Sequence, residues 1–265
     1  MTPLTAGNTR VKEARKLSRR SVRTERRLFL ADGPKAVEGA LEMTLDSGAD
    51  CVVEVFATPA ATQEYADLLA AAPVTLVDDR AMASLSDSVT PAGVVAVCRH
   101  VDVAWASVAG RPGLRLVVIC ADVRDPGNAG TVIRCADAAG ADAVVLAGDA
   151  VDLYNPKTIR ASVGSAFHLP IVVERDPVAA VRAAQEAGLT VLAADMAGTS
   201  VFAADELLGR PTAWLFGNEA WGLPDALAAS ADQVVSIPIF GRAESLNLAT
   251  AAAVCLYASA RAQRA

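Results

Sequence analysis

Residues 114–148 read "LRLVVICADVRDPGNAGTVIRCADAAGADAVVLAG". The run at 114–120 is apolar and rich in β-branched residues, as a buried strand is, and the run at 142–146 has the same character. Between them, a loop rich in Gly and Asp leads into a stretch with helical spacing. The stretch predicts strand, loop, helix and strand, the unit from which parallel sheets are built.

The rest of the chain extends this pattern in both directions. Four more strand candidates, separated by helical stretches, lie at 169–173, 190–194, 212–216 and 232–239, so we expect an α/β domain with a parallel sheet covered on both faces. Residues 36–100 alternate helix and strand as a smaller α/β unit, and the Gly- and Pro-containing stretch "WASVAGRPG" at 105–113 predicts a linker. We therefore expect two domains, 1–105 and 112–265.

Composition is typical of a globular α/β protein. Of the 265 residues, 53% are hydrophobic and only 5% aromatic, which disfavours extensive disorder. The first residues contain no apolar leader, and the apolar run at 248–260 is shorter than the roughly 18 residues that span a bilayer. We expect a cytoplasmic protein without a membrane partner.

Cysteine and histidine usage argues against two classes of site. The five cysteines stand singly among apolar residues, which predicts buried thiols and not a disulfide framework or a C-x-x-C metal site. With only two histidines in the chain, a zinc centre has few ligands to draw on, so we expect no metal.

The charge distribution is uneven. The net charge is −6, yet residues 1–35 contain ten Lys or Arg and only three acidic residues. At 100° per residue, four arginines fall on one face of a predicted helix: Arg15, Arg19, Arg23 and Arg26. Two interpretations stay open, a solvated surface helix and a face that contacts RNA phosphates.

Polar residues gather in three loops that follow strands, where open parallel sheets bind ligands. Each loop also has a purely structural interpretation: Asn128 as a helix cap, Arg134 as an exposed helix cation, Glu219 in a solvated turn, and Ser245 or Asn247 as the cap of the last helix. The first loop contains neither the G-x-G-x-x-G spacing of a dinucleotide site nor the G-K-[ST] of a phosphate loop.

Taken in order, the three loops resemble the signature motifs of the SpoU/TrmH-type RNA 2′-O-methyltransferases of the SPOUT superfamily. The motifs stand here as "NAGTVIR" at 128–134, "FGNEAWGL" at 216–223 and "IPIFGRAESLN" at 237–247, and "ASVGSAFHLPI" at 161–171 resembles a further family segment. The resemblance spans residues 122–257. Ala220 departs from the Gly that the family usually has there. Residues 7–41 also resemble the ribosomal-protein-like substrate-binding domain that many members carry.

The resemblance implies a carboxyl-terminal trefoil knot, a homodimer and S-adenosylmethionine as cofactor. It implies that the cofactor is held by Gly217, Ile237, Leu246 and Asn247, and that the catalytic site contains Arg134, Asn128, Glu219, Ser245 and Asn247. Arg134 is the family's catalytic arginine. Because a guanidinium does not lose its proton in proteins, we expect it to act electrostatically and not as a base.

The implied partner is RNA, with ribosomal RNA favoured over tRNA because the amino-terminal domain resembles the ribosomal type. The basic stretch would then supply affinity through phosphates without reading sequence. Two other classes remain as alternatives: a non-catalytic RNA-binding protein that keeps the SPOUT core as a scaffold, and a nucleotide-dependent oxidoreductase. The motif residues disfavour the first, and the missing glycine fingerprint disfavours the second.

Overall fold

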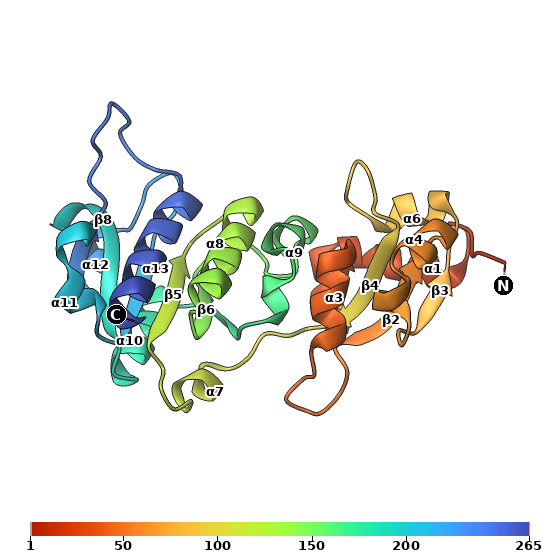
Figure 1. Ribbon diagram of the computed structural model, residues 1–265, viewed down its shortest axis with the longest axis horizontal. Coiled ribbons are helices and arrows are strands. Elements are labelled where there is room, and N and C mark those ends of the chain that lie inside the picture. Colours follow the sequence, from red (N-terminus) through yellow and green to blue (C-terminus); the bar gives the residue numbers. More distant parts are fainter. Residues whose placement is uncertain (1, 265) are drawn as a thin grey trace. The chain divides into compact units, whose positions relative to one another are not determined.

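The computed structural model describes residues 2–264, which form two compact units, one built on a four-stranded sheet and the other on a six-stranded sheet (Figure 1). The N-terminal unit contains the residues up to Val101 together with Asp152–His168. The C-terminal unit contains Asp102–Val151 and the residues from Leu169 onward. The segment Asp152–His168 thus leaves the C-terminal half of the sequence, an excursion that the expected division at 105–112 does not foresee.

The sheet of the N-terminal unit is mixed. β4 lies antiparallel to β1 and β2, and β2 lies parallel to β3. Its strands in spatial order are β1 (Leu28–Asp32), β4 (Val94–Arg99), β2 (Val52–Ala57) and β3 (Val74–Leu76). Its helices are α1 (Thr9–Arg15), η1 (Lys16–Ser18), α2 (Arg20–Arg26), α3 (Pro34–Glu42), α4 (Pro59–Glu64), α5 (Ala66–Leu69), α6 (Asp79–Leu85), α9 (Pro156–Ser162) and η2 (Ser165–Phe167).

The basic stretch near the amino terminus is not one helix, as the sequence analysis expected. It breaks between α1 and α2 at Arg19, whose backbone is extended at φ −91° and ψ 128°. The expected apolar side is nevertheless buried, with Val11 and Leu17 at most 2% exposed in the core of the N-terminal unit. The break changes the direction of each arginine that follows it, so the four arginines do not share one continuous helical face.

The C-terminal unit has the parallel sheet that its apolar strands predict, and all its neighbouring strands run parallel. The predicted strands are confirmed. In spatial order they are β10 (Gln233–Ser236), β8 (Thr190–Ser200), β9 (Thr212–Phe216), β5 (Leu116–Ala121), β6 (Ala143–Ala147) and β7 (Ile171–Glu174). The helices are α7 (Trp105–Ala109), α8 (Pro126–Ala139), α10 (Pro177–Glu186), η3 (Val201–Ala203), α11 (Asp205–Leu208), α12 (Asp225–Ala228) and α13 (Leu248–Arg264).

Helices cover both faces of this sheet, which explains why its strands read as continuous apolar runs. Alternate residues of β5, such as Val117 and Ile119, face a core shared with α10 and α12. On the other face α8 packs beside α13, as Figure 1 shows. There the fully buried Trp214 of β9 donates its indole N–H to the Ser259 hydroxyl of α13 at 2.9 Å.

Three elements escaped the sequence analysis. β1 at Leu28–Asp32 follows the basic stretch directly and has no alternating pattern, because four of its five residues are buried. α6 at Asp79–Leu85 is only two turns long, although Asp78 caps it through its side chain. The expected linker at 105–113 contains the short helix α7, so only its last residues are irregular.

Candidate active site

Two of the three motif loops leave adjacent strands at the same level. β5 and β9 are neighbours, and their register pairs Cys120 with Phe216 immediately before the loops begin. The chain runs outward from β5 through β6 and β7, then returns to the other side of β5 with β8 and β9. This reversal of strand order is where open parallel sheets place their ligand sites, so the topology brings the motif loops together.

A buried asparagine that the sequence analysis did not single out joins these two loops. Asn218, 6% exposed, donates its side-chain N–H to the backbone carbonyl of Asp122 at 2.7 Å. Its side-chain oxygen accepts the N–H of Ala220 at 2.8 Å. Asp122 has a left-handed backbone, φ 54°, which is unfavourable for a residue other than Gly or Asn and needs support from its neighbours.

The β9 loop closes on itself. Asn218 and Gly222 exchange two backbone hydrogen bonds, each 2.9 Å long. A Cβ on Gly217 would lie 2.3 Å from the backbone of Gly222, so this close approach requires glycine at 217. The two glycines that the sequence analysis placed around Glu219 therefore shape a tight, rigid loop.

Three predicted site residues form a hydrogen-bonded chain across all three motif loops. Glu219 accepts from the Asn128 side-chain N–H at 3.2 Å, and Asn128 accepts from the Asn247 side-chain N–H at 3.0 Å. Glu219 also accepts the backbone N–H groups of Arg124 and Asp125, at 3.2 and 3.0 Å. Glu219 is thus not a solvated turn residue, because its carboxylate holds the loop that precedes α8.

The capping interpretations divide in two. Asn128 does not cap α8, since Asp125 is the N-cap and its carboxylate accepts the Asn128 backbone N–H at 2.8 Å. This leaves the Asn128 side chain available for Glu219 and Asn247. Asn247 does cap α13, accepting the N–H of Ala249 at 2.9 Å, and its amide N–H still reaches Asn128. Capping and the link between loops therefore coexist in Asn247.

Arg134 lies six residues beyond Asn128 on α8, about 9 Å further along the helix axis at the usual rise. It is exposed, while its neighbours Val132 and Ile133 are fully buried against the sheet. The helix therefore presents a guanidinium to solvent close to the motif loops. Arg134 is not among the residues that line the pocket described next.

A pocket of about 450 Å³ lies beside these loops in the C-terminal unit. Its floor is apolar and buried, including Phe216 and Val235, each 1% exposed. Five predicted site residues line it: Gly217, Glu219, Ile237, Ser245 and Leu246. The end of β8 adds Asp195 and Met196, which the sequence analysis missed because nothing in that strand marks a functional position.

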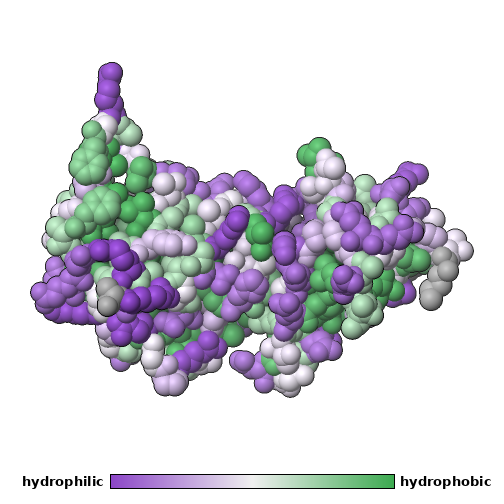
Figure 2. Space-filling view, in the orientation of Figure 1, coloured by the Kyte–Doolittle hydropathy of each residue, from purple (hydrophilic) through white to green (hydrophobic). Residues whose placement is uncertain are grey.

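One side of the pocket is formed by the loop between β10 and α13. This loop, residues 237–247, projects from the C-terminal unit as the blue trace at the top of Figure 1. Figure 2 shows a hydrophobic flank below a hydrophilic tip. Phe240 is 88% exposed there, so the loop presents apolar surface to solution.

The cysteines take no visible part in this site. Cys120 lies at the end of β5, fully buried, and burial followed by the charge of Glu219 raises its pKa to about 12. Cys51, Cys98 and Cys255 are also buried, whereas Cys135 is half-buried, in contrast to the expectation for all five. A thiol with so high a pKa is a poor nucleophile.

The four arginines predicted to bind RNA have different surroundings. Arg15, Arg19 and Arg26 are exposed, and Arg26 pairs with Glu13 at 2.7 Å. Arg23 is only 4% exposed, pairs with Asp152 at 2.6 Å and donates to the backbone carbonyl of Leu17 at 2.9 Å. Placing Arg23 on an RNA-binding face was therefore wrong, because its guanidinium is occupied inside the N-terminal unit.

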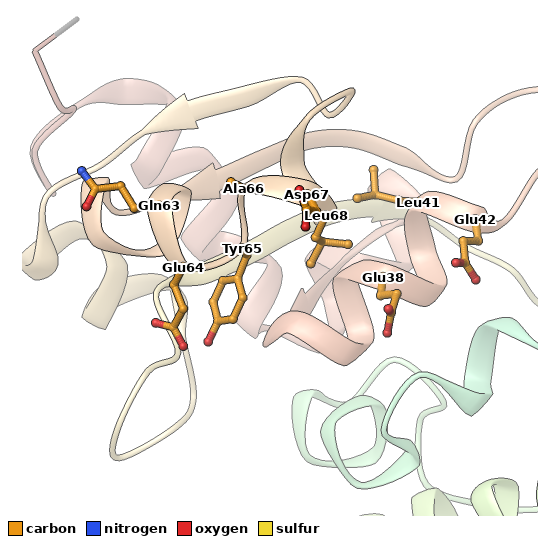
Figure 3. Close-up of a pocket in the computed structure, with 9 residues that line it drawn as sticks. All are labelled: Glu38, Leu41, Glu42, Gln63, Glu64, Tyr65, Ala66, Asp67 and Leu68. Carbon is orange, nitrogen blue, oxygen red and sulfur yellow. The ribbon is translucent and has the colours of Figure 1, made fainter.

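Two hollows of the N-terminal unit differ in charge. The one in Figure 3 is lined by Glu38, Glu42, Glu64 and Asp67 with Tyr65, so its acidic wall repels phosphates. A second hollow lies at the start of α3 and is lined by Lys35 and Arg160 together with Asp32. The exposed cations, and not the acidic hollow, are the parts of this unit suited to a polyanion.

Membrane and metal sites were also sought. Among residues 2–264, no group of His, Cys, Asp and Glu side chains is arranged to hold a metal ion. Within the same residues, no helix has both the length and the apolar character that a bilayer crossing needs.

Comparison with protein families gives two matches. Residues 115–257 match the model of the SpoU rRNA Methylase family, which covers every motif loop described above. Residues 8–96 match the MRM3-like substrate binding domain. The two matches correspond closely to the methyltransferase and substrate-binding resemblances drawn from the sequence.

Similar proteins are known by sequence and by structure. The 23S rRNA (guanosine(2553)-2'-O)-methyltransferase RlmP of Bacillus subtilis is 33% identical over 95% of this chain and 96% of its own. The 23S rRNA (uridine(2479)-2'-O)-methyltransferase of Streptomyces viridochromogenes is 43% identical over 51% of this chain and 49% of its own. The AdoMet-bound rRNA methyltransferase of Sinorhizobium meliloti has a TM-score of 0.82 at 30% identity, covering 98% of this chain and 97% of that chain.

Proposed function

This chain belongs to the SpoU rRNA methylase family, and on that premise we propose that its C-terminal unit methylates ribosomal RNA with Arg134 at the reacting oxygen. It is an RNA ribose-2′-O-methyltransferase that uses S-adenosylmethionine. The observation that carries the assignment of roles is the chain of hydrogen bonds from Glu219 through Asn128 to Asn247, because it ties all three motif loops together beside one pocket.

The pocket fits the chemistry of this cofactor. Its volume of about 450 Å³ lies within the usual range for small-ligand sites, roughly 300–1,000 Å³. The buried apolar floor suits an adenine ring, and the polar groups at its rim, among them Asp195 and Ser245, suit a ribose and an amino acid. When bound, S-adenosylmethionine supplies an electrophilic methyl group. We assign its binding to Gly217, Ile237, Leu246 and Asn247.

Arg134 then acts on the ribose. A 2′-hydroxyl is hardly ionised at neutral pH, so negative charge develops on its oxygen as the proton leaves. The exposed Arg134 guanidinium is always protonated and offers donors in a planar fork, which can hold this oxygen or the adjacent phosphate. Water or the phosphate accepts the proton, since a guanidinium cannot.

Asn128, Glu219 and Asn247 act as positioning residues in this proposal. Each spends its side chain on another loop: Glu219 on the start of α8, Asn128 on Glu219, and Asn247 on Asn128. They hold α8, and with it Arg134, in a defined place relative to the pocket. Ser245, on the pocket wall, faces the bound reactants.

RNA binding is assigned to both domains. We propose that residues 1–105 select the RNA and residues 112–265 carry out the transfer, with Asp152–His168 serving the first domain structurally. The exposed cations Arg15, Arg19 and Arg26 supply affinity through phosphates, without sequence information. Ribosomal RNA is preferred over tRNA because the relatives named above act on 23S rRNA.

Three further properties follow from family membership. We propose that the carboxyl-terminal segment forms a trefoil knot and that the protein works as a homodimer in the cytoplasm, where ribosomes are assembled. The exposed apolar side chains of the C-terminal unit support the dimer, since large apolar exposure often marks an interface. The most exposed are Met196 at 76%, Phe240 at 88% and Tyr257 at 55%.

The proposal is tested with an unmodified 23S rRNA transcript and labelled S-adenosylmethionine. Label should enter a ribose 2′-oxygen at a single position, mapped by resistance to alkaline cleavage. Sedimentation of the same preparation should give twice the mass of the chain. Label on a base, or none with a folded protein that binds the cofactor, would remove ribose methylation of ribosomal RNA from consideration.

A further inference from the structure

An exposed tryptophan stands at the edge of the pocket. Trp221 lies in the β9 loop, two residues after Glu219, and its side chain is 55% exposed. It lines the pocket, but the buried floor is formed by other residues. Tryptophan is rarely left this open on a surface unless a partner covers it.

The loop holds Trp221 in a fixed place. The paired backbone hydrogen bonds between Asn218 and Gly222 close the turn on either side of it. Asn218 fastens the turn to Asp122, and Glu219 fastens it to the start of α8. An apolar ring on so constrained a backbone loses little freedom when a ligand covers it, which favours binding.

A second flat group faces the ring. The Arg124 guanidinium carbon lies 5.2 Å from the centroid of the Trp221 ring, within the range of a cation–π contact. Asp149 orients this guanidinium through an ion pair of 2.8 Å, in which the Arg124 side chain remains 55% exposed. The pair therefore combines an aromatic face with a positive charge, both open to solution at the mouth of the pocket.

This combination matches one chemical class of ligand. Single-stranded RNA is bound by aromatic rings and arginines on which unstacked bases lie, while cations contact the phosphates. Methylation of a ribose needs that ribose presented singly to the methyl donor, and the 2′-hydroxyl itself is the same in all four nucleotides. A stacking surface holds any base and so supplies position, not sequence.

We propose that Trp221, supported by Arg124, is the platform on which a nucleobase of the RNA stacks, at the target nucleotide or its immediate neighbour. This inference rests on the proposed function of the C-terminal unit. Two other occupants of the ring serve as outcomes of the test: the adenine of the cofactor, since Trp221 lines the pocket, and a second copy of the chain.

The test compares Trp221→Ala and Trp221→Phe with the parent protein. Phe202→Ala is the matched control, because Phe202 is an aromatic side chain of the same unit, 59% exposed, that does not line the pocket. An unmodified 23S rRNA transcript is the probe. Loss of one base stack, about 1–3 kcal/mol, corresponds to a fivefold to 150-fold weaker RNA affinity for Trp221→Ala.

Three further results are expected. Trp221→Phe should recover most of the RNA affinity, because a smaller ring still stacks. S-adenosylmethionine affinity and dimer mass should stay at the parent values in both variants. Addition of the transcript should quench tryptophan fluorescence in the parent and in Phe202→Ala, and distinctly less in Trp221→Phe.

Several outcomes overturn the inference. Parent-like RNA affinity in Trp221→Ala does so directly, a selective loss of cofactor affinity assigns the ring to adenine, and a loss of dimer mass assigns it to the partner copy. A parent protein that is folded and binds cofactor but never methylates the transcript contradicts the proposed function instead. Failure of the inference alone leaves methylation by the parent intact.

Discussion

Replacement of Asn218 by Ala isolates the contact that joins the β5 and β9 loops. The substitution removes the donor to the Asp122 carbonyl, 2.7 Å away, and the acceptor for the Ala220 N–H, 2.8 Å away. Asn218 is only 6% exposed, so water replaces these contacts poorly. A buried polar group left without a partner costs about 1–3 kcal/mol, and two such groups, both partly reached by solvent, give a loss of about 2–4 kcal/mol.

The consequence extends to function because Asp122 holds a left-handed backbone at φ 54° and Gly217 and Glu219 lie in the same loop. Once the loop loosens, the cofactor pocket loses its shape, and S-adenosylmethionine affinity should fall together with stability. Urea unfolding followed through tryptophan fluorescence, with the fully buried Trp214 as reporter of the C-terminal unit, measures the first quantity. Calorimetric titration with the cofactor measures the second.

Asn218→Asp serves as the control for chemistry at this position. Aspartate keeps an acceptor for Ala220 but turns a carboxylate oxygen toward the Asp122 carbonyl, so it should destabilise at least as much as alanine. The reasoning fails if Asn218→Ala lies within about 0.5 kcal/mol of the parent, the range of an ordinary surface substitution, and binds cofactor normally. It also fails if Asn218→Asp is the milder change.

Other parts of the molecule give three further predictions. Arg134→Ala should lower the single-turnover methylation rate by about 10²–10³ while leaving the urea midpoint and cofactor affinity unchanged, and a rate within about threefold of the parent would exclude its catalytic role. Alanine at Arg15 and Arg19 should flatten the salt dependence of RNA binding by about 0.7–0.9 in slope per phosphate contact, whereas Arg23→Ala should instead destabilise the N-terminal unit by about 3 kcal/mol; the reverse pattern would refute both placements. Burial raises the pKa of the Cys120 thiol from 9.0 to about 12, so its contribution to stability is complete below pH 9 and is lost as the pH rises toward 12. Cys120→Ala should therefore show a shallower alkaline fall in urea midpoint, and an unchanged fall would count against this assignment.

Sequence alone was enough for the parallel sheet and for the position of its loops. Strands such as β5 and β9 are buried on both faces, so they read as continuous apolar runs, and that character depends only on the residues themselves. The spacing of Asn128, Glu219 and Asn247 in three separate loops was likewise visible without coordinates. Helix boundaries near Arg19 were not, because a periodic pattern continues across a backbone break that tertiary packing imposes.

Tertiary structure decided which of these residues touch. The order of strands places β9 beside β5, which brings Asn218 to Asp122 across 96 positions of sequence. The same kind of distant contact, with Asp152 at a separation of 129, turns Arg23 from a surface cation into an interior one. Local patterns record only the propensities of neighbouring residues, whereas the burial and pairing of a polar side chain depend on what the fold brings against it from elsewhere in the chain.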